Sequence, residues 1–543
     1  MNYSTYVITL LTILLLCGGL TGSAQSIPEP VADGGIYLFL DELVGDGLTD
    51  LNRAVKPYSR RMITAALEEA EDHREQLTGR QRRELDFWLE AYGMTTPQGK
   101  LKLVYNPATA QYRDSLFSVT VSPILGLTGG LTPDASADLL TGVANTRPVS
   151  WKNGAKAYGN YRNWGFFAAL QDNHQDPLLG SAQYLTRERG GHIKGGTDFS
   201  EMTGGISYSW EWGDIAFLKD APVWGSGYAG TNIFSGRAPS FMQIRLHLQP
   251  VHWAEMTWMH GWLTSMVIDS TRSFWVTNAY GTDYRELYCR KYIAANIFTV
   301  TPVPRLRLSL GNSVIWSDPR LSPYYLMPIF FYKSVDHGIT SGIENSNSQM
   351  FLDVSSTNIR HLHLYGTLFI DEMSTKRFFT SDYNFFSWKG GVRGGNFSFM
   401  PNIWLTAECT FTYPLTFQHN VPVLTFENQG YNMGHWLRDN SRSWYFSLDW
   451  RPVRTMTLRL WHEWSERSVD YQSVGGTRLG LLYLESVEWS NTTTGLDASW
   501  YVTGGVQVRA EVTRRNVTGM EFWYPSHLFG KTTSFTGGVV WGF

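Results

Sequence analysis

The sequence predicts an all-β transmembrane barrel of about 18 antiparallel strands, preceded by a small α-helical bundle. Three observations predict this fold. The spacing of apolar residues changes from a helical to a strand period after about residue 114, the connections between strand-like segments alternate in length, and the sequence ends on an alternating aromatic strand. We therefore expect a signal peptide at 1–24, a periplasmic helical region at 25–113 and a barrel at 114–543.

The first segment has the features of an export signal. Residues Val7 to Cys17 form an apolar run that is too short to cross a bilayer as a helix. The small residues Gly22 to Ala24 follow it, and they predict signal-peptidase cleavage after Ala24. The residues before the run include no Lys or Arg, which departs from the usual pattern. A lipid anchor at Cys17 is disfavoured, because Leu16 stands where a small residue is expected.

Three short amphipathic helices are expected before residue 100. The stretch from Ile36 to Leu43 repeats apolar residues at i, i+4 and i+7. A second helix begins after Ser59, a suitable N-cap, and a third begins at Thr78 with Gln81 in capping-box spacing and stops at Gly93. Because each helix has one apolar face, the three must pack on one another or on a larger surface.

The remaining sequence alternates apolar residues with small or polar ones, as at Phe117, Val119 and Val121. Eight short turns are interleaved with nine long loops, which gives 18 strands. Outer-membrane barrels have this asymmetry, with short periplasmic turns and long extracellular loops. Short turns are expected at 161–163, 212–213, 249–251, 301–304, 355–358, 394–396, 451–454 and 503–505, and long loops near 127–150, 173–202, 220–240, 263–289, 317–347, 371–383, 414–441, 465–489 and 515–532.

The final strand has the pattern of an outer-membrane assembly signal. Counting back from Phe543, every second residue is Trp541, Val539, Gly537 and Phe535. We expect the barrel-assembly machinery to recognise this alternating strand with its terminal aromatic residue. Since such a strand ends in the periplasm and the strand number is even, the helices are expected in the periplasm too.

Composition agrees with a membrane barrel and argues against a nucleic-acid partner. The 45 Lys and Arg residues are balanced by 48 Asp and Glu, so no basic surface is expected to neutralise phosphates. The 543 residues include 22 Trp and 28 Tyr, which barrels use in belts at both membrane interfaces. A mean hydropathy of −0.22 is far below that of a helical membrane protein, because lumen-facing positions alternate with lipid-facing ones.

Motifs of catalysis, cofactor binding and metal binding are weak. The stretch Trp224 to Gly230 contains G-x-G-x-x-G, but no helix-forming run follows, so a tightly folded loop is favoured over a nucleotide site. His361 and His363 could supply half of a metal site, although lumen-facing polar residues are the favoured interpretation. Cys289 and Cys409 are interpreted as ordinary strand residues. We expect no enzyme activity, no cofactor and no metal.

The long loops are expected to carry the function. They combine aromatic rings, which stack on the C–H faces of sugars, with groups that hydrogen-bond sugar hydroxyls. The alternative is that these loops fold over the barrel and plug it. The candidate glycan-binding residues are Trp224, Tyr228, Asn232, Arg237, Arg187, Arg189, Tyr324 and Tyr325.

Five stretches of the sequence, taken in order, carry a family resemblance. They are Tyr37–Leu43 with Gly45–Leu48, Lys56–Arg60, Trp224–Gly227, Ser235–Leu246 and Leu368–Glu372. Through them the sequence resembles the capsule assembly Wzi family of outer-membrane proteins, in a divergent, Bacteroidetes-like branch. The resemblance implies an 18-stranded barrel with a periplasmic helical bundle and a lectin-like role in holding exported polysaccharide at the cell surface. The loops match no known glycan-binding set, so the ligand stays open.

The leading interpretation is an outer-membrane surface protein that binds capsular or extracellular polysaccharide and helps attach or assemble the capsule. The alternative is an outer-membrane porin or specific transport channel, because an 18-stranded barrel is wide enough for an aqueous path. A TonB-coupled receptor is disfavoured, since the helical region is too short for a plug domain. The expected partners are the polysaccharide, the lipid bilayer and the barrel-assembly machinery, with no nucleic acid.

Overall fold

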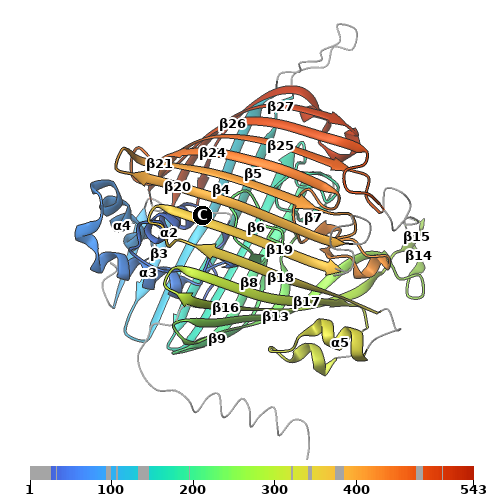
Figure 1. Ribbon diagram of the computed structural model, residues 1–543, viewed down its shortest axis with the longest axis horizontal. Helices are drawn as coiled ribbons and strands as arrows, with labels where there is room; N and C mark the ends of the chain where they lie inside the picture. Colours follow the sequence, from blue (N-terminus) through green and yellow to red (C-terminus); the bar gives the residue numbers. More distant parts are fainter. Residues whose placement is uncertain are drawn as a thin grey trace, which may run out of the picture.

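The computed structural model shows a closed barrel with helices at one end and long loops at the other (Figure 1). The expected signal peptide with its cleavage site at Ala24, and the terminal Phe543, lie outside the described residues. The structure describes residues 26–31, 34–92, 99–105, 108–132, 146–194, 196–279, 281–318, 322–339, 345–372, 384–471, 481–503 and 505–542.

The three expected helices are confirmed, together with the caps that begin two of them. The Ser59 hydroxyl accepts a hydrogen bond from the backbone N–H of Met62 at 3.2 Å. Thr78 and Gln81 form the reciprocal capping box, in which each side chain accepts from the other residue's backbone N–H. The helices are α2 (Gly35–Asp46), α3 (Arg60–Asp72) and α4 (Gly79–Ala91), with a 3-10 turn, η2 (Arg74–Gln76), between the last two.

The helices bury their apolar faces against one another and against the barrel. Leu43 of α2, Ile63 of α3 and Leu85 of α4 are each 0% exposed and belong to one cluster. Full burial of such a side chain stabilises the fold by roughly 1.5–3 kcal/mol. Tyr501, near the end of a barrel strand, belongs to the same cluster. Its hydroxyl accepts a hydrogen bond from the Gly35 backbone N–H at 3.0 Å. The bundle is therefore docked on the barrel.

In the described part of the chain, eighteen antiparallel strands form the closed barrel, as the sequence predicts. No helix among these residues is long and apolar enough to cross a membrane. The strands are β4 (Phe117–Leu131), β5 (Val149–Tyr161), β6 (Trp164–Asp176), β8 (Asp198–Trp210), β9 (Gly213–Asp220), β12 (Phe241–Val251), β13 (Ala254–Ile268), β16 (Tyr288–Val303), β17 (Leu306–Trp316), β18 (Ser346–Ser356), β19 (Leu362–Glu372), β20 (Phe385–Phe397), β21 (Met400–Thr412), β24 (Ser441–Trp450), β25 (Met456–Ser468), β26 (Val487–Thr503), β27 (Val506–Gly519) and β28 (Gly530–Trp541).

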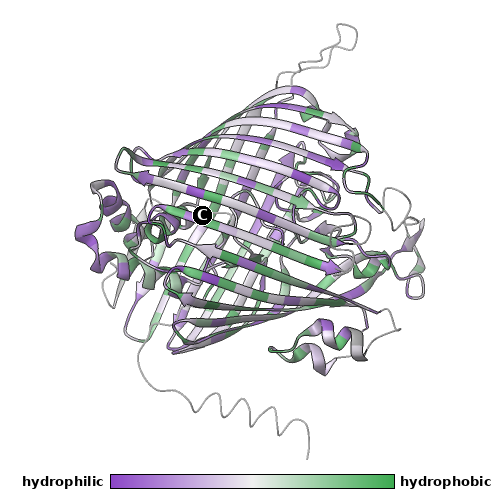
Figure 2. Ribbon diagram, viewed as in Figure 1, coloured by the Kyte–Doolittle hydropathy of each residue, from purple (hydrophilic) through white to green (hydrophobic). Residues whose placement is uncertain are grey.

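The barrel closes where the last strand pairs with the first. Strand β28 pairs with β4 from Phe535 opposite Leu131 to Trp541 opposite Leu125. Hydrophilic and hydrophobic residues alternate along the strands (Figure 2). Phe535 and Val539 are 46% and 47% exposed on the outer face, whereas Trp541 is half-buried. The recognition of this strand by assembly machinery stays a prediction.

Strand structure begins earlier than the expected boundary at residue 114. A hairpin of β2 (Lys100–Tyr105) and β3 (Ala108–Arg113) precedes β4, and β3 pairs with the beginning of β4, from Arg113 opposite Ser118 to Ala110 opposite Val121. Each of these strands has only six residues, which is too few for a two-residue period to stand out in the sequence.

Two of the short turns lie later than expected. The turn expected at 249–251 lies after Val251, because the pairing register shifts between Leu248 and Val251 and such an irregularity accommodates Pro250 within the strand. The turn expected at 394–396 lies after Phe397, where β20 also has an irregularity next to Gly395. Pro250 and Gly395 therefore mark irregularities within strands β12 and β20, and the turns follow them.

The helices lie at the end of the barrel that carries the short turns, here called the short-turn end (Figure 1). The His361 backbone N–H donates to the Gly45 carbonyl at 2.9 Å, and Arg61 donates to the Trp210 carbonyl at 2.8 Å. The opposite end, here called the long-loop end, carries the long connections. Several of these contain short elements: β7 (His192–Lys194), β10 (Val223–Trp224), β11 (Phe234–Ser235), β14 (Phe274–Asn278), β15 (Gly281–Arg285), η3 (Pro323–Leu326), α5 (Tyr332–Ile339), η6 (Pro422–Leu424), β22 (Glu427–Asn428), β23 (Tyr431–Asn432), η7 (Glu521–Trp523) and η8 (Ser526–Leu528).

A buried quartet of charges fixes the helices to the turn between β24 and β25. Arg80 of α4 forms ion pairs with Glu42 of α2 and Glu84 of α4, the latter at 2.6 Å. Arg451 of the turn forms ion pairs with the same two carboxylates. All four side chains are at most 4% exposed. Because each charge is compensated only by the others, removal of one member leaves a buried charge without its partner.

Substitution of Glu42 by Ala should therefore weaken the docking of the helices while the barrel stays closed. We expect a loss of about 3–5 kcal/mol, the usual cost of breaking a buried ion pair. Limited proteolysis of the folded protein in detergent measures this as faster cleavage within residues 35–91. The control is Glu71→Ala, which removes an exposed ion pair with Arg74 and should cost less than about 1 kcal/mol. Equal cleavage of the two variants would contradict the role of the quartet.

Candidate functional site

An apolar plug fills one side of the barrel lumen. It consists of residues 49–58, the loop 221–240 and the loop 413–440, which meet inside the barrel. The β10 strand of loop 221–240 pairs with β1 (Val55–Lys56) on one side and with β11 on the other. Side chains from both loops and from the inner barrel wall form one buried cluster, which includes Trp224, Phe234, Phe351, Phe369 and Phe426, each at most 2% exposed.

The glycine-rich stretch at 225–230 folds tightly because its backbone binds carboxylates of the barrel wall. The Ser226 N–H donates to Asp353 at 2.7 Å. The N–H groups of Tyr228 and Ala229 donate to the two oxygens of Glu408 at 2.6 and 2.9 Å. Gly225 has a φ of 99°, which favours glycine. The motif therefore forms a tightly folded loop between β10 and β11, as the sequence predicts.

A large cavity occupies the lumen beside the plug, and we call it the luminal cavity. Its volume is about 560 Å³. Strands β5, β6 and β8 form one side of it, and loops 177–191 and 221–240 form the other. Seven of its lining residues are Lys or Arg and four are Asp or Glu, so the cavity favours an anionic ligand. The charged and aromatic lining residues used below are Lys152, Lys156, Tyr158, Arg187, Glu188, Arg189, Glu201, Tyr228, Arg237 and Trp436.

Arg187 brings positive charge and aromatic surface together in the luminal cavity. Its guanidinium lies 5.2 Å from the ring centroids of both Trp436 and Tyr445. It also forms an ion pair with Glu463 at 2.6 Å, yet its side chain stays 35% exposed. Arg189, 29% exposed, forms an ion pair with Glu201 at 2.5 Å. Both arginines are therefore held in place and still face the cavity solvent.

Glu188, the acidic residue between Arg187 and Arg189, has a pKa above its ordinary value. Glu188 contacts the cavity solvent, but the barrel wall surrounds it and limits access to bulk water. Desolvation by the protein around this exposed side chain raises the pKa of its carboxyl group, while the positive charges of Arg509, Arg237 and Arg515 act in the opposite direction. The cavity therefore contains a carboxyl group that binds a proton more readily than one in water.

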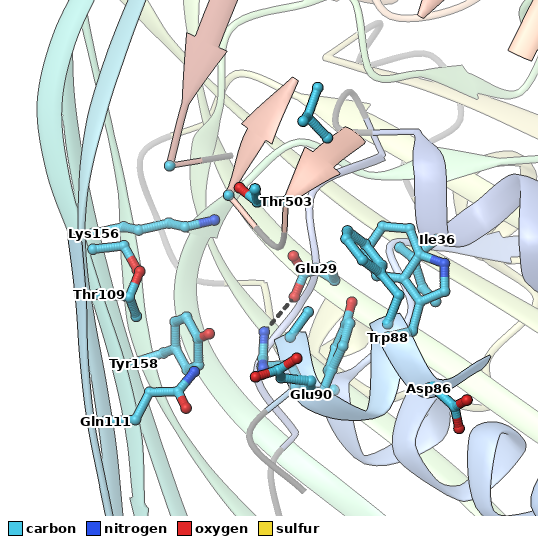
Figure 3. Close-up of a pocket in the computed structure, with 18 of the residues that line it drawn as sticks. Glu29, Ile36, Asp86, Trp88, Glu90, Thr109, Gln111, Lys156, Tyr158 and Thr503 are labelled. Atoms are coloured by element: carbon cyan, nitrogen blue, oxygen red, sulfur yellow. Dashed lines mark hydrogen bonds and ion pairs between the residues drawn. The ribbon is translucent and has the colours of Figure 1, made fainter. Parts of the chain in front are cut away.

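A second cavity, the helix-side cavity, lies between the helices and the barrel wall at the short-turn end (Figure 3). Its volume is also about 560 Å³. Lys156, Thr109, Tyr158 and Gln111 project into it from the wall, and Glu29, Trp88 and Glu90 line it from the other side (Figure 3). The two cavities share five lining residues, namely Glu29, Arg60, Lys156, Tyr158 and Gly542.

Arg60 lies at the junction of the two cavities. Its guanidinium is 3.9 Å from the ring centroid of Tyr158 on the wall and 4.2 Å from that of Tyr92 after α4. It forms an ion pair with Glu29 at 2.8 Å. The arginine is thus held between two rings and one carboxylate, at the place where the two cavities share their lining residues.

Three of the candidate glycan-binding residues have structural contacts inside the plug. Trp224, 2% exposed, packs edge-on against Phe234, and Asn232, 0% exposed, hydrogen-bonds the wall residues Ser387 and Thr367. Arg237 also borders the luminal cavity, but it is only 3% exposed and donates to the backbone carbonyls of Thr186, Ser181 and Tyr184. Burial and the nearby charge of Arg438 lower the pKa of Arg237 to about 10. These contacts leave little side-chain surface for a ligand.

The other five candidates divide between two places. Arg187, Arg189 and Tyr228 line the luminal cavity, where the Tyr228 hydroxyl also hydrogen-bonds His363 at 2.9 Å. Tyr324 and Tyr325 lie on loop 317–345 instead, the first 41% exposed and the second 3% exposed. The structure therefore brings only part of the set together, and glycan binding by any of the eight residues stays a prediction.

The barrel wall contributes residues to the luminal cavity that were not predicted from the sequence. Lys152, Lys156 and Tyr158 line it from β5. They share one parity along the strand, and the neighbouring Trp151 of the opposite parity is 41% exposed on the outer face. This alternation was present in the sequence and could have identified them. Trp436 carried no such signal, because it lies in an irregular loop.

The two histidines are occupied by hydrogen bonds. The His361 ring bonds Asp46 at 2.8 Å, and the His363 ring bonds the hydroxyls of Tyr228 and Ser355 at 2.9 and 2.8 Å. Within the residues that the structure describes, no group of three His, Cys, Asp or Glu residues could hold a metal ion. Cys289 and Cys409 are free and lie on strands β16 and β21.

The closed antiparallel barrel and its alternation of short and long connections define a β-barrel of the outer-membrane type. No protein-family model and no curated protein sequence matches the chain. Among solved structures, its fold is similar to that of Wzi from Escherichia coli, an outer-membrane protein involved in group 1 capsule assembly and described as a carbohydrate-binding β-barrel. The TM-score is 0.56 at 12% identity, over 96% of this chain and 99% of that chain. The expected resemblance to Wzi is thus confirmed for the fold.

Other solved barrels are less similar. OccAB2 of Acinetobacter baumannii has a TM-score of 0.43 at 9% identity, over 78% of this chain and 98% of that chain. OccK9 (OpdG) of Pseudomonas aeruginosa has a TM-score of 0.41 at 10% identity, over 78% and 97% of the two chains. Likenesses at this level carry no argument about function.

The anchoring of the plug to the barrel wall can be tested at Glu408. This carboxylate binds two loop N–H groups and forms an ion pair at 2.6 Å with Lys389, and both charged side chains are 1% exposed. Glu408→Ala should cost about 3–5 kcal/mol and loosen loop 221–240, because it leaves the Lys389 charge buried without its partner. Single-channel recording in planar bilayers should then show larger or noisier currents than the wild type.

The matched control for Glu408→Ala is Asp269→Ala. It removes an ion pair with Arg272 at 2.5 Å on an exposed outer loop, so the currents should not change. Wild-type currents from Glu408→Ala in a correctly folded barrel would show that Glu408 does not hold the plug.

Proposed function

We propose that the protein binds exported capsular or extracellular polysaccharide at the surface of the outer membrane, without enzymatic activity, and helps attach or assemble the capsule. The luminal cavity is the observation that carries this proposal. It is rich in cationic side chains, has partly exposed tyrosine rings, and lies in a barrel whose lumen is partly filled by the plug. The likeness in fold to a carbohydrate-binding barrel supports it.

The chemistry of the cavity suits an acidic sugar chain. Arg187, whose side chain is 35% exposed, offers a guanidinium for a carboxylate, and the partly exposed rings of Tyr158 and Tyr228 offer faces for a sugar. Lys152 and Lys156 contribute further positive charge from the opposite wall. A chain that enters from the long-loop end would therefore meet both kinds of contact at once, whereas a neutral apolar ligand would have to desolvate these charges.

The proposed location follows from the same fold. We place the mature protein in the outer membrane after cleavage behind Ala24, with the helices in the periplasm and nine long loops outside. Assembly would use the strand that contains Phe535, Val539 and Trp541 and ends at Phe543. The partners are then the polysaccharide, the lipid bilayer and the barrel-assembly machinery.

A transport channel is the second candidate, and one observation favours it. The luminal and helix-side cavities share five lining residues on the side of the barrel that the plug leaves open. Planar-bilayer recordings separate the two functions. Large, steady currents through the unaltered protein would favour a channel, and small or absent currents would favour a binding protein whose lumen is blocked at Arg60.

Lys156 provides a direct test of polysaccharide binding. Lys156→Gln keeps most of the side-chain length and removes the charge. We expect about tenfold weaker binding of the purified protein to the host's own polysaccharide, which corresponds to about 1.4 kcal/mol, and a smaller difference at high salt. Calorimetry or a surface-binding assay measures both. The control is Lys531→Gln, which alters an exposed lysine on β28 and should bind as the wild type does.

Deletion of the gene tests the cellular role. Polysaccharide should be made at normal levels but be released into the medium, because its attachment and not its synthesis is lost. Unchanged retention on the deleted strain, together with no binding by the purified protein, would exclude the proposed function.

A further inference from the structure

One long loop packs on the outside of the barrel. Residues 322–339 of loop 317–345, here called the strap, contain η3 and α5. In Figure 1, α5 lies outside the barrel, next to β17 and β18. Tyr325 and Tyr332 of the strap are 3% and 0% exposed, and they belong to a buried cluster with wall residues such as Trp258 and Trp316.

The parity of the wall strands identifies the covered face as the outer one. On β13, Met259 and Leu263 pack into the plug inside the lumen, whereas Met256 and Trp258 of the other parity pack against the strap. On β17, Ile315 belongs to the plug cluster and its neighbour Trp316 to the strap cluster. The strap therefore covers positions that would otherwise face lipid.

Two asparagines on this outer face satisfy the irregular backbone of the strap. Asn296 donates to the carbonyls of Pro328 and Phe330 at 2.8 and 2.9 Å. Asn312 accepts from the Tyr332 N–H at 2.8 Å and also donates to Asn296 at 2.6 Å. Irregular backbone is tolerated at membrane depth only where such partners replace water. An outward asparagine on a lipid-facing strand would be costly without a partner of this kind.

The outer surface of the strap is apolar and uncharged. Residues 324–331 contain no charged side chain. Met327, Ile329 and Phe331 are 42%, 68% and 49% exposed. This surface continues the exposed apolar belt of the neighbouring strands, where Leu310 and Leu352 are 55% and 42% exposed.

The charged residues of the strap turn away from this surface. Lys333 donates to the backbone carbonyls of Ser348 and Asp371 at 3.1 and 2.8 Å. Asp336 accepts from the hydroxyls of Ser346 and Ser348 at 2.5 and 2.7 Å. Both charges are therefore satisfied at the long-loop ends of β18 and β19, where no acyl chain has to solvate them.

We infer that the strap binds the acyl chains of the outer membrane with its outer surface. The strap is then an intramembrane element and not part of an aqueous outer loop, and Asn296 and Asn312 are the positioning residues that hold it there. The partner surface is lipid, supplied by the bilayer that surrounds the barrel. This surface is separate from the luminal cavity, so its test does not depend on polysaccharide binding.

Fluorescence quenching tests the inference directly. A polarity-insensitive fluorophore is attached to Ile329→Cys in a background with Cys17, Cys289 and Cys409 replaced by Ser, and the folded full chain is placed in phosphatidylcholine vesicles. Lipid with brominated acyl chains should quench the label to the same degree as a label at Leu310→Cys, and aqueous iodide should not. A label at Thr282→Cys, on the exposed β14–β15 hairpin, should show the reverse.

Two results would overturn the inference. Quenching of the Ile329 label by iodide and not by brominated lipid would place the strap in water. Protection from both quenchers would show that a protein surface, such as a second copy of the barrel, covers it.

The variant Asn296→Ala tests whether Asn296 positions the strap, because it removes the two hydrogen bonds that Asn296 donates to strap carbonyls. The Ile329 label should lose quenching by brominated lipid and gain quenching by iodide, while the Leu310 label stays lipid-quenched as evidence of correct insertion. If the Ile329 label behaves as in the unsubstituted protein, Asn296 does not position the strap.

Discussion

Backbone hydrogen bonding in the absence of water determines the architecture of this protein. A strand that crosses a bilayer has no solvent to satisfy its N–H and C=O groups, so every strand needs a neighbour on both sides. The pairing of β28 with β4 meets this requirement and makes the sheet a cylinder. Closure also separates two environments, one of lipid and one of enclosed solvent. The alternating sequence of each strand, the outward aromatic residues and the inward charged ones all follow from that separation.

Polar residues on the inner face of the barrel determine how the loops fold inside the lumen. Inward carboxylates such as Asp353 and Glu408 cannot stay buried without partners, and the N–H groups of Ser226, Tyr228 and Ala229 supply them. The plug is therefore organised by the polar wall as much as by its own apolar cluster. The same reasoning applies outside the barrel, where Asn296 and Asn312 organise the strap. In both places a polar residue on a regular strand determines the path of an irregular loop.

Most of the fold could be predicted from local sequence, because strands, turns and helix caps follow from residues close together in the chain. Ser59 and the Thr78–Gln81 pair located two helix starts, and the alternation of connection lengths gave 18 strands. The candidate site was harder to predict. Whether a loop turns into the lumen, as Trp224 does, or onto the outer wall, as Tyr325 does, depends on residues more than one strand away in sequence. Lys156 could have been predicted as a cavity residue, because its position in the alternation along β5 places its side chain on the inner face.

The hairpin of β2 and β3 has a consequence for the edge of the sheet. Strand β4 pairs with β3 over Ser118 to Val121 and with β28 over Leu125 to Leu131, so one strand is covered by two different partners along its length. The early hairpin thereby shields the stretch of β4 that the last strand does not reach. An uncovered stretch there would offer a template for pairing with a foreign strand. The β2–β3 hairpin, between the helices and the barrel, thus protects the edge of β4 from pairing with a strand of another protein.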